Sequence, residues 1–288
     1  MLENVAIVTD STACLPQEVV HQYNVEVVPL RFAWQGETYR DGIDITPEII
    51  YRILPTAKEL PTTSAPSPGD YLEALQKLGQ KYRSILVITL SARLSTMSDS
   101  ARVAREMVGE RLQNVAVEVL DCGSAAGAQG LVVLAAAHAA GAGGNLAEVT
   151  QVARRVSAKV NLVAFLDTLH YLAKGGRVPK AVAWANSLAK VKPIFHIAPL
   201  SGEVTTLKMA RTRHGAVRQL LQMVKGKAGG KPVHAIVMHS HSLDEAERLR
   251  YSLATQLQCD ELYVSDFTPA MGIHTGPGVL GIAYYADD

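Results

Sequence analysis

Short apolar runs alternate with helical patterns through the first half of the chain. Four runs rich in β-branched residues are typical of buried strands, at residues 5–10, 25–30, 84–90 and 115–120. Apolar residues recur with helical spacing at residues 47–54, 69–80, 97–109 and 125–140. Continuous apolar strands joined by helices indicate a mostly parallel sheet with helices on both faces. The first half is therefore predicted to be an α/β domain.

The second half follows a different order. A strand at 160–166 precedes helical patterns through Lys190, and two strands within 193–210 are joined by a turn at 201–203. The later elements alternate, with helices at 213–225 and 243–257 and strands at 233–239, 261–266 and 279–286. A hairpin combined with strand-helix-strand units predicts a mixed sheet, hence an α+β domain. We place the two domains at residues 1–157 and 158–288.

Composition excludes several functions. The chain has 288 residues and a net charge of +1 from 28 basic and 27 acidic side chains, which gives no basic surface for nucleic acid. Three widely spaced cysteines fit neither a disulfide framework nor a zinc site. The most apolar stretch, "GLVVLAAAHAAGAGG", is shorter than a transmembrane span and is predicted to be a buried helix. We expect a cytoplasmic protein without a signal peptide.

A first cluster of hydroxyl side chains precedes a predicted helix, in "TTSAPSPGD" at 62–70. Ser67 and Asp70 have the spacing of a helix N-cap and its acidic third position, with a proline between them. Capping does not require Thr62, Thr63 or Ser64, which leaves them free for a ligand or simply for a polar loop.

A second cluster, "LSARLSTMSDSA" at 90–101, has the same arrangement. Thr96 and Asp99 are spaced for a capping box, and Ser91 and Ser95 remain. Ser91 and Ser95 also follow a predicted strand, and ligands of open α/β sheets bind beyond the carboxyl ends of strands. Two such loops, each at a helix N-terminus, favour an anion such as a carboxylate.

Other motifs are weaker. His239 and His241 have no cysteine or carboxylate at a telling spacing, so we predict no metal site. Arg177 lies in "KGGRVP", and His274 lies in a glycine-rich turn, "GIHTGPG" at 272–278. A hydrolase with Ser95 as nucleophile and His274 as base is conceivable, but the sequence offers no acid to orient the histidine. A binding module for another small anion is a further alternative.

The whole chain resembles the DegV family of bacterial fatty-acid-binding proteins. The resemblance rests on "IVTDSTACLP", "TTSAPSPGDY", "ITLSARLSTMSDSA", "VLDCGSAAGAQGLVV", "YLAKGGRVPK", "LKMARTR" and "GIHTGPG", in this order. It implies two α/β domains with a long-chain fatty acid held in a tunnel between them. The chain departs from the family pattern at Ala65, where glutamine is common, and at Thr96, where glycine is common.

The resemblance also assigns roles to individual residues. It implies that Thr63 and Ser95 hold the fatty-acid carboxylate, with Ser64 as the neighbouring candidate. Arg211 and His274 are implied to bind the lipid at its head group, and Arg177 to lie at the head group or at a partner interface.

The resemblance implies a lipid-binding protein with no catalytic residues, no cofactor and the fatty acid as ligand. Some family members present the acyl carboxylate to a separate fatty acid kinase subunit, which phosphorylates it. No segment of this chain resembles an ATP site, so phosphorylation would depend on that partner. No transmembrane segment is expected, and a transient contact with a membrane is compatible with lipid exchange.

Overall fold

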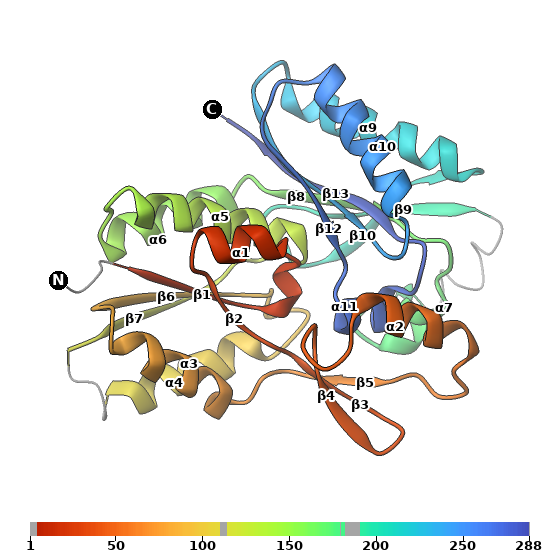
Figure 1. Ribbon diagram of the computed structural model, residues 1–288. Helices are drawn as coiled ribbons and strands as arrows, with labels where there is room; N and C mark the ends of the chain where they lie inside the picture. The colour runs from red at the N-terminus through yellow and green to blue at the C-terminus, as the bar shows by residue number, and fades with distance from the viewer. Residues whose placement is uncertain (1–4, 110–113, 179, 182–190, 288) are drawn as a thin grey trace.

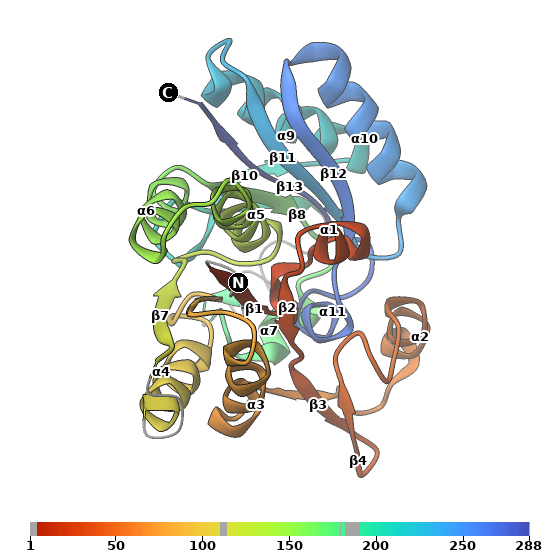
Figure 2. The ribbon, with the colours of Figure 1, turned by 60° about the vertical axis from the view of Figure 1, so that its left-hand side comes forward.

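A computed structural model describes residues 5–109, 114–178, 180–181 and 191–287. Its elements stack in layers, in which two helices, a first sheet, two helices, a second sheet and two further helices follow one another (Figures 1 and 2). The first sheet is parallel and the second is mixed, which confirms the predicted α/β class. The helical pattern predicted up to Lys190 lies partly outside the described residues. No helix within the described ranges is long and apolar enough to cross a membrane.

The first sheet is built from the apolar runs of the N-terminal half. Its order is β2 (Glu26–Val28), β1 (Ala6–Asp10), β6 (Ser84–Thr89) and β7 (Ala116–Asp121), all parallel. The two central strands are almost entirely buried because helices cover both faces. One face carries α3 (Pro68–Gly79) and α4 (Met97–Gly109), and the other carries α5 (Gly127–Gly141) and α6 (Leu146–Ser157). The predicted capping box at Ser67 and Asp70 begins α3.

Helix α5 lies between the two sheets, which explains its small residues. Its first eleven residues are all buried, and it contacts β1 on one side and strands of the second sheet on the other. A Cβ on Gly127 would lie 2.7 Å from Met238 Sδ, and one on Gly130 would lie 2.7 Å from the carbonyl oxygen of Ala13. Even an alanine at these two positions would press on the facing layer.

The second sheet contains the strands of the C-terminal half. Its order is β10 (Val204–Ala210), β9 (Lys192–Ile197), β8 (Asn161–Phe165), β13 (Leu280–Ala286), β11 (Val233–His239) and β12 (Cys259–Asp266). Only the β11–β12 pair is parallel, so the sheet is mixed as predicted, and β9 and β10 form the predicted hairpin. Helices α9 (Arg213–Ala228) and α10 (Leu243–Gln256) cover its outer face.

A third sheet was not predicted from the sequence. It is antiparallel, in the order β4 (Glu37–Arg40), β3 (Arg31–Trp34) and β5 (Thr62–Ser64). The expectation of a loop at 62–64 was therefore wrong, because these residues pair with β3. The short helices α2 (Pro47–Ile53) and η2 (Leu54–Thr56) connect β4 to β5.

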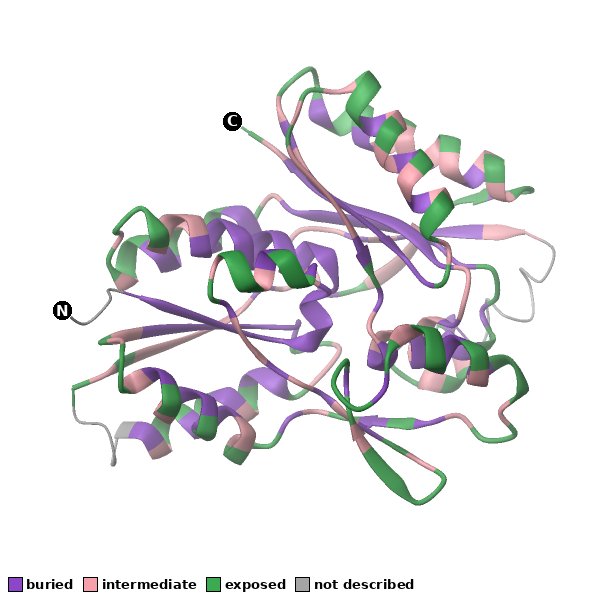
Figure 3. Cartoon of the chain, viewed as in Figure 1, coloured by how far each residue is buried: buried purple, intermediate pink, exposed green. Residues whose placement is uncertain are grey.

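Short helices complete the region between the sheets. They are η1 (Ser11–Ala13), α1 (Gln17–Gln22), α7 (His170–Gly175) and α11 (Pro269–Thr275). His274 lies on α11, so the predicted turn at 272–278 was wrong for its first half; the chain leaves the helix only at Gly276. Buried residues lie in both halves of the chain (Figure 3). The largest cluster of buried apolar side chains contains residues of both halves, such as Leu86 and Ile236.

Candidate functional site

An apolar cavity of about 150 Å³ lies between the two sheets. Its walls come from both halves of the chain, and most of the side chains are aliphatic or aromatic. Representative wall residues are Leu30, Leu90, Leu94, Leu162, Phe195 and Phe267. Strand alternation explains the contribution of β8, since Leu162 and Ala164 face the cavity while Val163 packs into the outer core. The cavity therefore offers a long apolar ligand a surface that water solvates poorly.

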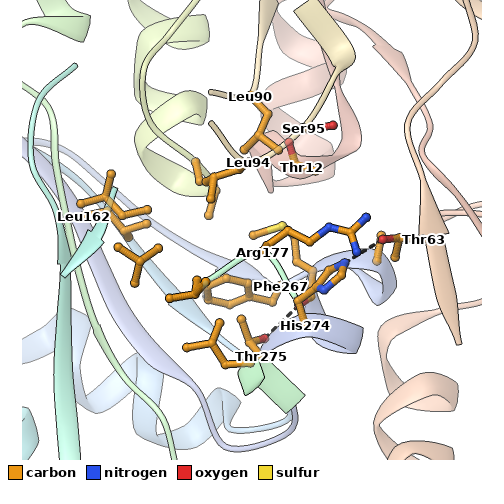
Figure 4. A pocket seen from close by; sticks show the side chains of 18 of the residues that line it. Thr12, Thr63, Leu90, Leu94, Ser95, Leu162, Arg177, Phe267, His274 and Thr275 are labelled. Atoms are coloured by element: carbon orange, nitrogen blue, oxygen red, sulfur yellow. Dashed lines mark hydrogen bonds between the residues drawn. The ribbon is translucent and has the colours of Figure 1, made fainter. Parts of the chain in front are cut away.

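One end of this cavity is polar. Thr63 of β5 and His274 of α11 meet there, with 2.7 Å between Thr63 Oγ1 and His274 Nε2. Figure 4 shows Arg177 beside the Thr63–His274 pair and Leu162 at the opposite end, while Ser95 lies next to Leu90 and Thr12. Thr63 and Ser95, predicted from separate hydroxyl clusters, thus line one cavity.

The two hydroxyl-bearing segments are held in different ways. Ser95 lies in the loop before α4, and its backbone N–H donates to the carbonyl of Ser91 at 3.2 Å. Ser64 also lines the cavity, but it is exposed, and its hydroxyl donates over 3.5 Å to the carbonyl of Arg31. The hydroxyl of Ser64 is thus directed to the backbone of β3.

His274 is positioned by contacts from distant segments. Helix α11 begins where the backbone N–H of Ala270 donates to Asp41 Oδ1 at 2.7 Å. The hydroxyl of Tyr51 donates to the carbonyl of Phe267 at 2.9 Å, just before the same helix. On the opposite side, a Cβ on Gly175 would lie only 2.6 Å from His274 Nδ1. The imidazole is thus confined between α7 and β5.

The imidazole of His274 is held neutral. Burial and, to a smaller extent, the neighbouring Arg177 guanidinium together lower its pKa from 6.5 to about 4. Its Nδ1 atom is buried and has no hydrogen-bond partner among the described residues. A histidine in this state can donate one hydrogen bond through Nε2 or accept one there, according to its tautomer.

The basic residues predicted for the site fall in different places. Arg177 is exposed, lines the polar end, and donates to the carbonyl of Gly175 at 3.0 Å. Arg211 is exposed after β10 and is not among the residues lining the cavity. Arg213, two residues later, does not line the cavity either and forms ion pairs with Asp167 at 2.9 Å and Glu245 at 2.5 Å. The sequence motif did not distinguish the two arginines.

A second, more polar pocket adjoins the first. Its volume is about 240 Å³, and Thr63, His274 and Arg177 belong to both pockets. Lys174 lines only the second one. The Thr63–His274 pair therefore separates an apolar cavity from a pocket that carries two cationic side chains.

A buried polar network supports the loop that carries Ser95. The carboxylate of Asp10, at the end of β1, accepts hydrogen bonds from the side chain and backbone of Thr12, from Gln129 Nε2 at 3.0 Å and from the backbone N–H of Leu90 at 3.2 Å. Burial raises the pKa of Asp10, and these donors oppose the rise. The role of Asp10 as a scaffold depends on Gln129, which is distant in the chain.

The two histidines weighed for metal binding lie elsewhere. His239 Nδ1 is 3.0 Å from Asp266 Oδ1 across the parallel strands β11 and β12. Within the described ranges, the residue group with metal-ligand spacing includes neither His239 nor His241.

Comparison with known proteins places the chain in a family. The profile of the DegV family, described as uncharacterised proteins, matches residues 4–287. Protein DegV of Bacillus subtilis is 32% identical over 283 residues, covering 98% of this chain and 99% of that protein. A DegV domain-containing protein of Streptomyces coelicolor is 34% identical over 284 residues, covering 98% of each chain. The protein belongs to the DegV family.

Solved structures agree with this assignment. A DegV family protein from Thermus thermophilus, described in terms of its fatty acid binding, superimposes with a TM-score of 0.90 and 29% identity, covering 99% of this chain and 100% of that one. Bacillus subtilis DegV, described as a fatty acid binding protein, gives a TM-score of 0.87 and 30% identity with the same coverage.

Proposed function

We propose that the protein binds a long-chain fatty acid in the cavity between its sheets, with the carboxylate at Thr63 and Ser95 and the acyl chain toward Leu162. The observation that carries the proposal is the lining of the cavity, which is mostly apolar and meets the polar Thr63–His274 pair and Arg177 at one end. The relatives described as fatty acid binding proteins share the fold over nearly the whole chain.

The energetics favour an acyl chain as the main source of affinity. Burial of about fourteen methylenes at ~0.8 kcal/mol each contributes roughly 11 kcal/mol. Association and ordering cost about 4–15 kcal/mol, so the tail alone gives a marginal complex. Charge-assisted hydrogen bonds to the carboxylate add about 1.5–3 kcal/mol each and fix the orientation of the ligand.

The neutral histidine sets the direction of the hydrogen bonds. A carboxylate accepts and cannot donate, so the Thr63 hydroxyl has to donate to it. Thr63 Oγ1 then accepts from Nε2–H of His274, and the Nδ1 atom carries only a lone pair. This tautomer suits the structure, because the other would leave a buried Nδ1–H donor without an acceptor. Arg177 supplies positive charge at the same end.

Mass spectrometry of lipid extracted from the purified protein tests the proposal. We expect one long-chain fatty acid per chain, and a Thr63→Ala/Ser95→Ala double variant that retains at least tenfold less. Thr38→Ala is the matched control, since Thr38 is exposed on the same small sheet and does not line the cavity. Full retention by the double variant would refute the head-group assignment, and repeated absence of lipid from intact wild-type protein would refute lipid binding.

We further propose that the protein presents the carboxylate to a partner fatty acid kinase subunit. The polar pocket beyond Thr63 and His274 supports this proposal. Lys174 and Arg177 line the pocket, which gives a phosphoryl donor a route to the bound carboxylate. Acyl phosphate formation with such a kinase subunit and ATP should fall in Lys174→Ala while fatty-acid retention stays unchanged. Lys58→Ala, at an exposed position outside both pockets, is the control. Equal rates with protein-bound and free fatty acid would contradict presentation.

The hydrolase alternative lacks support. A serine nucleophile needs a histidine base that an acid orients through its other nitrogen. In the described structure, His274 Nε2 contacts Thr63 and Nδ1 contacts no carboxylate. The arrangement favours holding a carboxylate over activating a serine.

A further inference from the structure

We propose that a divalent transition-metal ion binds at the end of the second sheet farthest from α11, where β11 and β12 begin and β13 ends. Its ligands are Nε2 of His234 and the carboxylates of Asp260 and Asp287. One potential ligand atom from each residue lies within 4.8 Å of the other two. His234 Nε2 and Asp287 Oδ1 are already 3.5 Å apart. The end of β13 is marked C in Figure 1. This end of the sheet is remote from the Thr63–His274 pair.

The first argument is the backbone irregularity that presents Asp260. Val233 pairs with Cys259, but the next residue, His234, pairs with Glu261, so Asp260 is an extra residue in β12. In a regular strand, Asp260 and Glu261 would point to opposite faces of the sheet. A bulge changes the direction of a side chain, and bulges are frequent beside binding sites. Here it brings both carboxylates near one imidazole.

The second argument is the way the imidazole is presented. His234 Nδ1 lies 2.6 Å from Glu261 Oε2, and because a carboxylate only accepts, the proton resides on Nδ1. The ring of His234 stacks on Tyr285, with centroids 4.5 Å apart and planes 4° from parallel. In the neutral ring, a proton on Nδ1 places the lone pair on Nε2, and the stacking on Tyr285 fixes its direction. A carboxylate bonded to the far nitrogen is the usual support of a metal-bound histidine.

The backbones that carry the two aspartates are also held in place. The N–H of Asp287 donates to the carbonyl of Pro232 at 3.1 Å, and the N–H of Val233 donates to the carbonyl of Gln258 at 2.9 Å. Both aspartate side chains are exposed. A small rotation of each would bring the oxygens to about 2.0–2.2 Å from a shared ion.

The ligand set indicates the class of ion. One imidazole nitrogen with two carboxylate oxygens suits Zn²⁺ and neighbouring first-row ions, whereas Mg²⁺ prefers an all-oxygen shell. Three protein ligands leave a position for water. The ion would clamp the end of β13 to β11 and β12. Glu261 extends the connection to α5, since its Oε1 lies 3.4 Å from His138 Nε2.

Isothermal titration of EDTA-treated, desalted protein with ZnCl₂ tests the site. We expect one equivalent of Zn²⁺ per wild-type chain, with affinity at least tenfold weaker in His234→Gln and in Asp287→Asn. Glu261→Gln should weaken binding roughly 10–100-fold without removing a ligand. The melting temperature of the wild type should rise with the logarithm of ZnCl₂ concentration, and MgCl₂ should not reproduce the effect.

Three controls keep the test decisive. His214→Gln and Asp244→Asn alter exposed residues outside the cluster and should bind zinc like the wild type. Cys259→Ser should also bind normally, because the neighbouring thiol is not a proposed ligand. Asp287→Asn changes an exposed residue directly after β13, so it separates lost binding from a damaged fold. Zinc binding that survives in His234→Gln and Asp287→Asn, disappears in Cys259→Ser, or is absent from the wild type would overturn the proposal.

Discussion

Asp41 and Ala270 join the two halves of the chain at the start of α11, where Asp41 Oδ1 accepts the backbone N–H of Ala270 at 2.7 Å. The second carboxylate oxygen accepts from the hydroxyl of Ser11 at 2.6 Å. Asp41 is buried, and burial raises its pKa while these donors oppose the rise. The helix that carries His274 thus begins on a carboxylate from the other half of the chain.

Replacement of this carboxylate should therefore affect both stability and ligand binding. In Asp41→Ala, the N–H of Ala270 and the hydroxyl of Ser11 lose their buried acceptor, which costs about 1–3 kcal/mol each. We expect a lower free energy of unfolding in urea and weaker retention of fatty acid, because α11 loosens. Asp44→Ala removes an exposed ion pair with Arg40 and should change the free energy of unfolding by less than ~1 kcal/mol. Equal effects of the two substitutions would show that Asp41 does not anchor α11.

The buried histidine should make stability depend on pH. The pKa of His274 is about 4 in the folded protein and 6.5 in its ordinary state, so between these values the unfolded chain binds the extra proton. The free energy of unfolding should fall as pH drops from 6.5 to 4, by up to ~3 kcal/mol from this residue.

Urea titrations at a series of pH values measure this dependence. His274→Gln should have a flatter profile than the wild type between pH 6.5 and 4, while His214→Gln, altered at an exposed position, should follow the wild type. Parallel profiles for wild type and His274→Gln would mean that His274 takes up its proton equally in both states.

Gly175 should be required for the position of His274. A Cβ at this residue would lie 2.6 Å from His274 Nδ1, so Gly175→Ala has to displace the imidazole from Thr63. We expect fatty-acid retention to fall several-fold. Gly226→Ala is the matched control, since it lies inside α9 with open space around it and should stabilise the helix by about 1 kcal/mol. Normal retention by Gly175→Ala would place the head group away from His274.

The sequence predicted the elements that depend on local signals. The buried strands of the first sheet have continuous apolar runs, and α3 has its capping box within four residues. Both features follow from short-range physical chemistry. Local patterns of this kind are therefore sufficient to predict the class of both large sheets.

Elements fixed by distant contacts were missed. β5 has only three residues and is a strand because it pairs with β3, some thirty positions earlier. α11 is helical in a glycine-rich segment because Asp41 and Tyr51 hold its start. The pattern of residues in either segment is equally compatible with a loop.

The candidate site shows the same division. Thr63 and Ser95 came from the hydroxyl clusters together with the family resemblance, and Arg177 and His274 came from the resemblance; all four line one cavity. Arg211 came from the same source but is exposed and lies outside the cavity lining. Arg213, two residues later, pairs with Asp167 and Glu245 and does not line the cavity either. Periodicity along β10 does not predict the direction of either side chain, because the strand has ended before both.

The length of the apolar cavity should set the length of the bound acyl chain. Ala164 faces the cavity from β8, between Leu162 and Leu166, and its small side chain leaves space beside them. Ala164→Leu should fill part of that space, so mass spectrometry of the co-purified lipid should show a shift toward fatty acids shorter by two or more carbons. Ala254→Leu, which adds the same volume on the exposed face of α10, should leave the lipid profile unchanged. Because Ala164→Leu leaves Thr63 and Ser95 intact, total occupancy should fall less than in their double variant. An unaltered profile in Ala164→Leu would mean that the acyl chain does not reach β8.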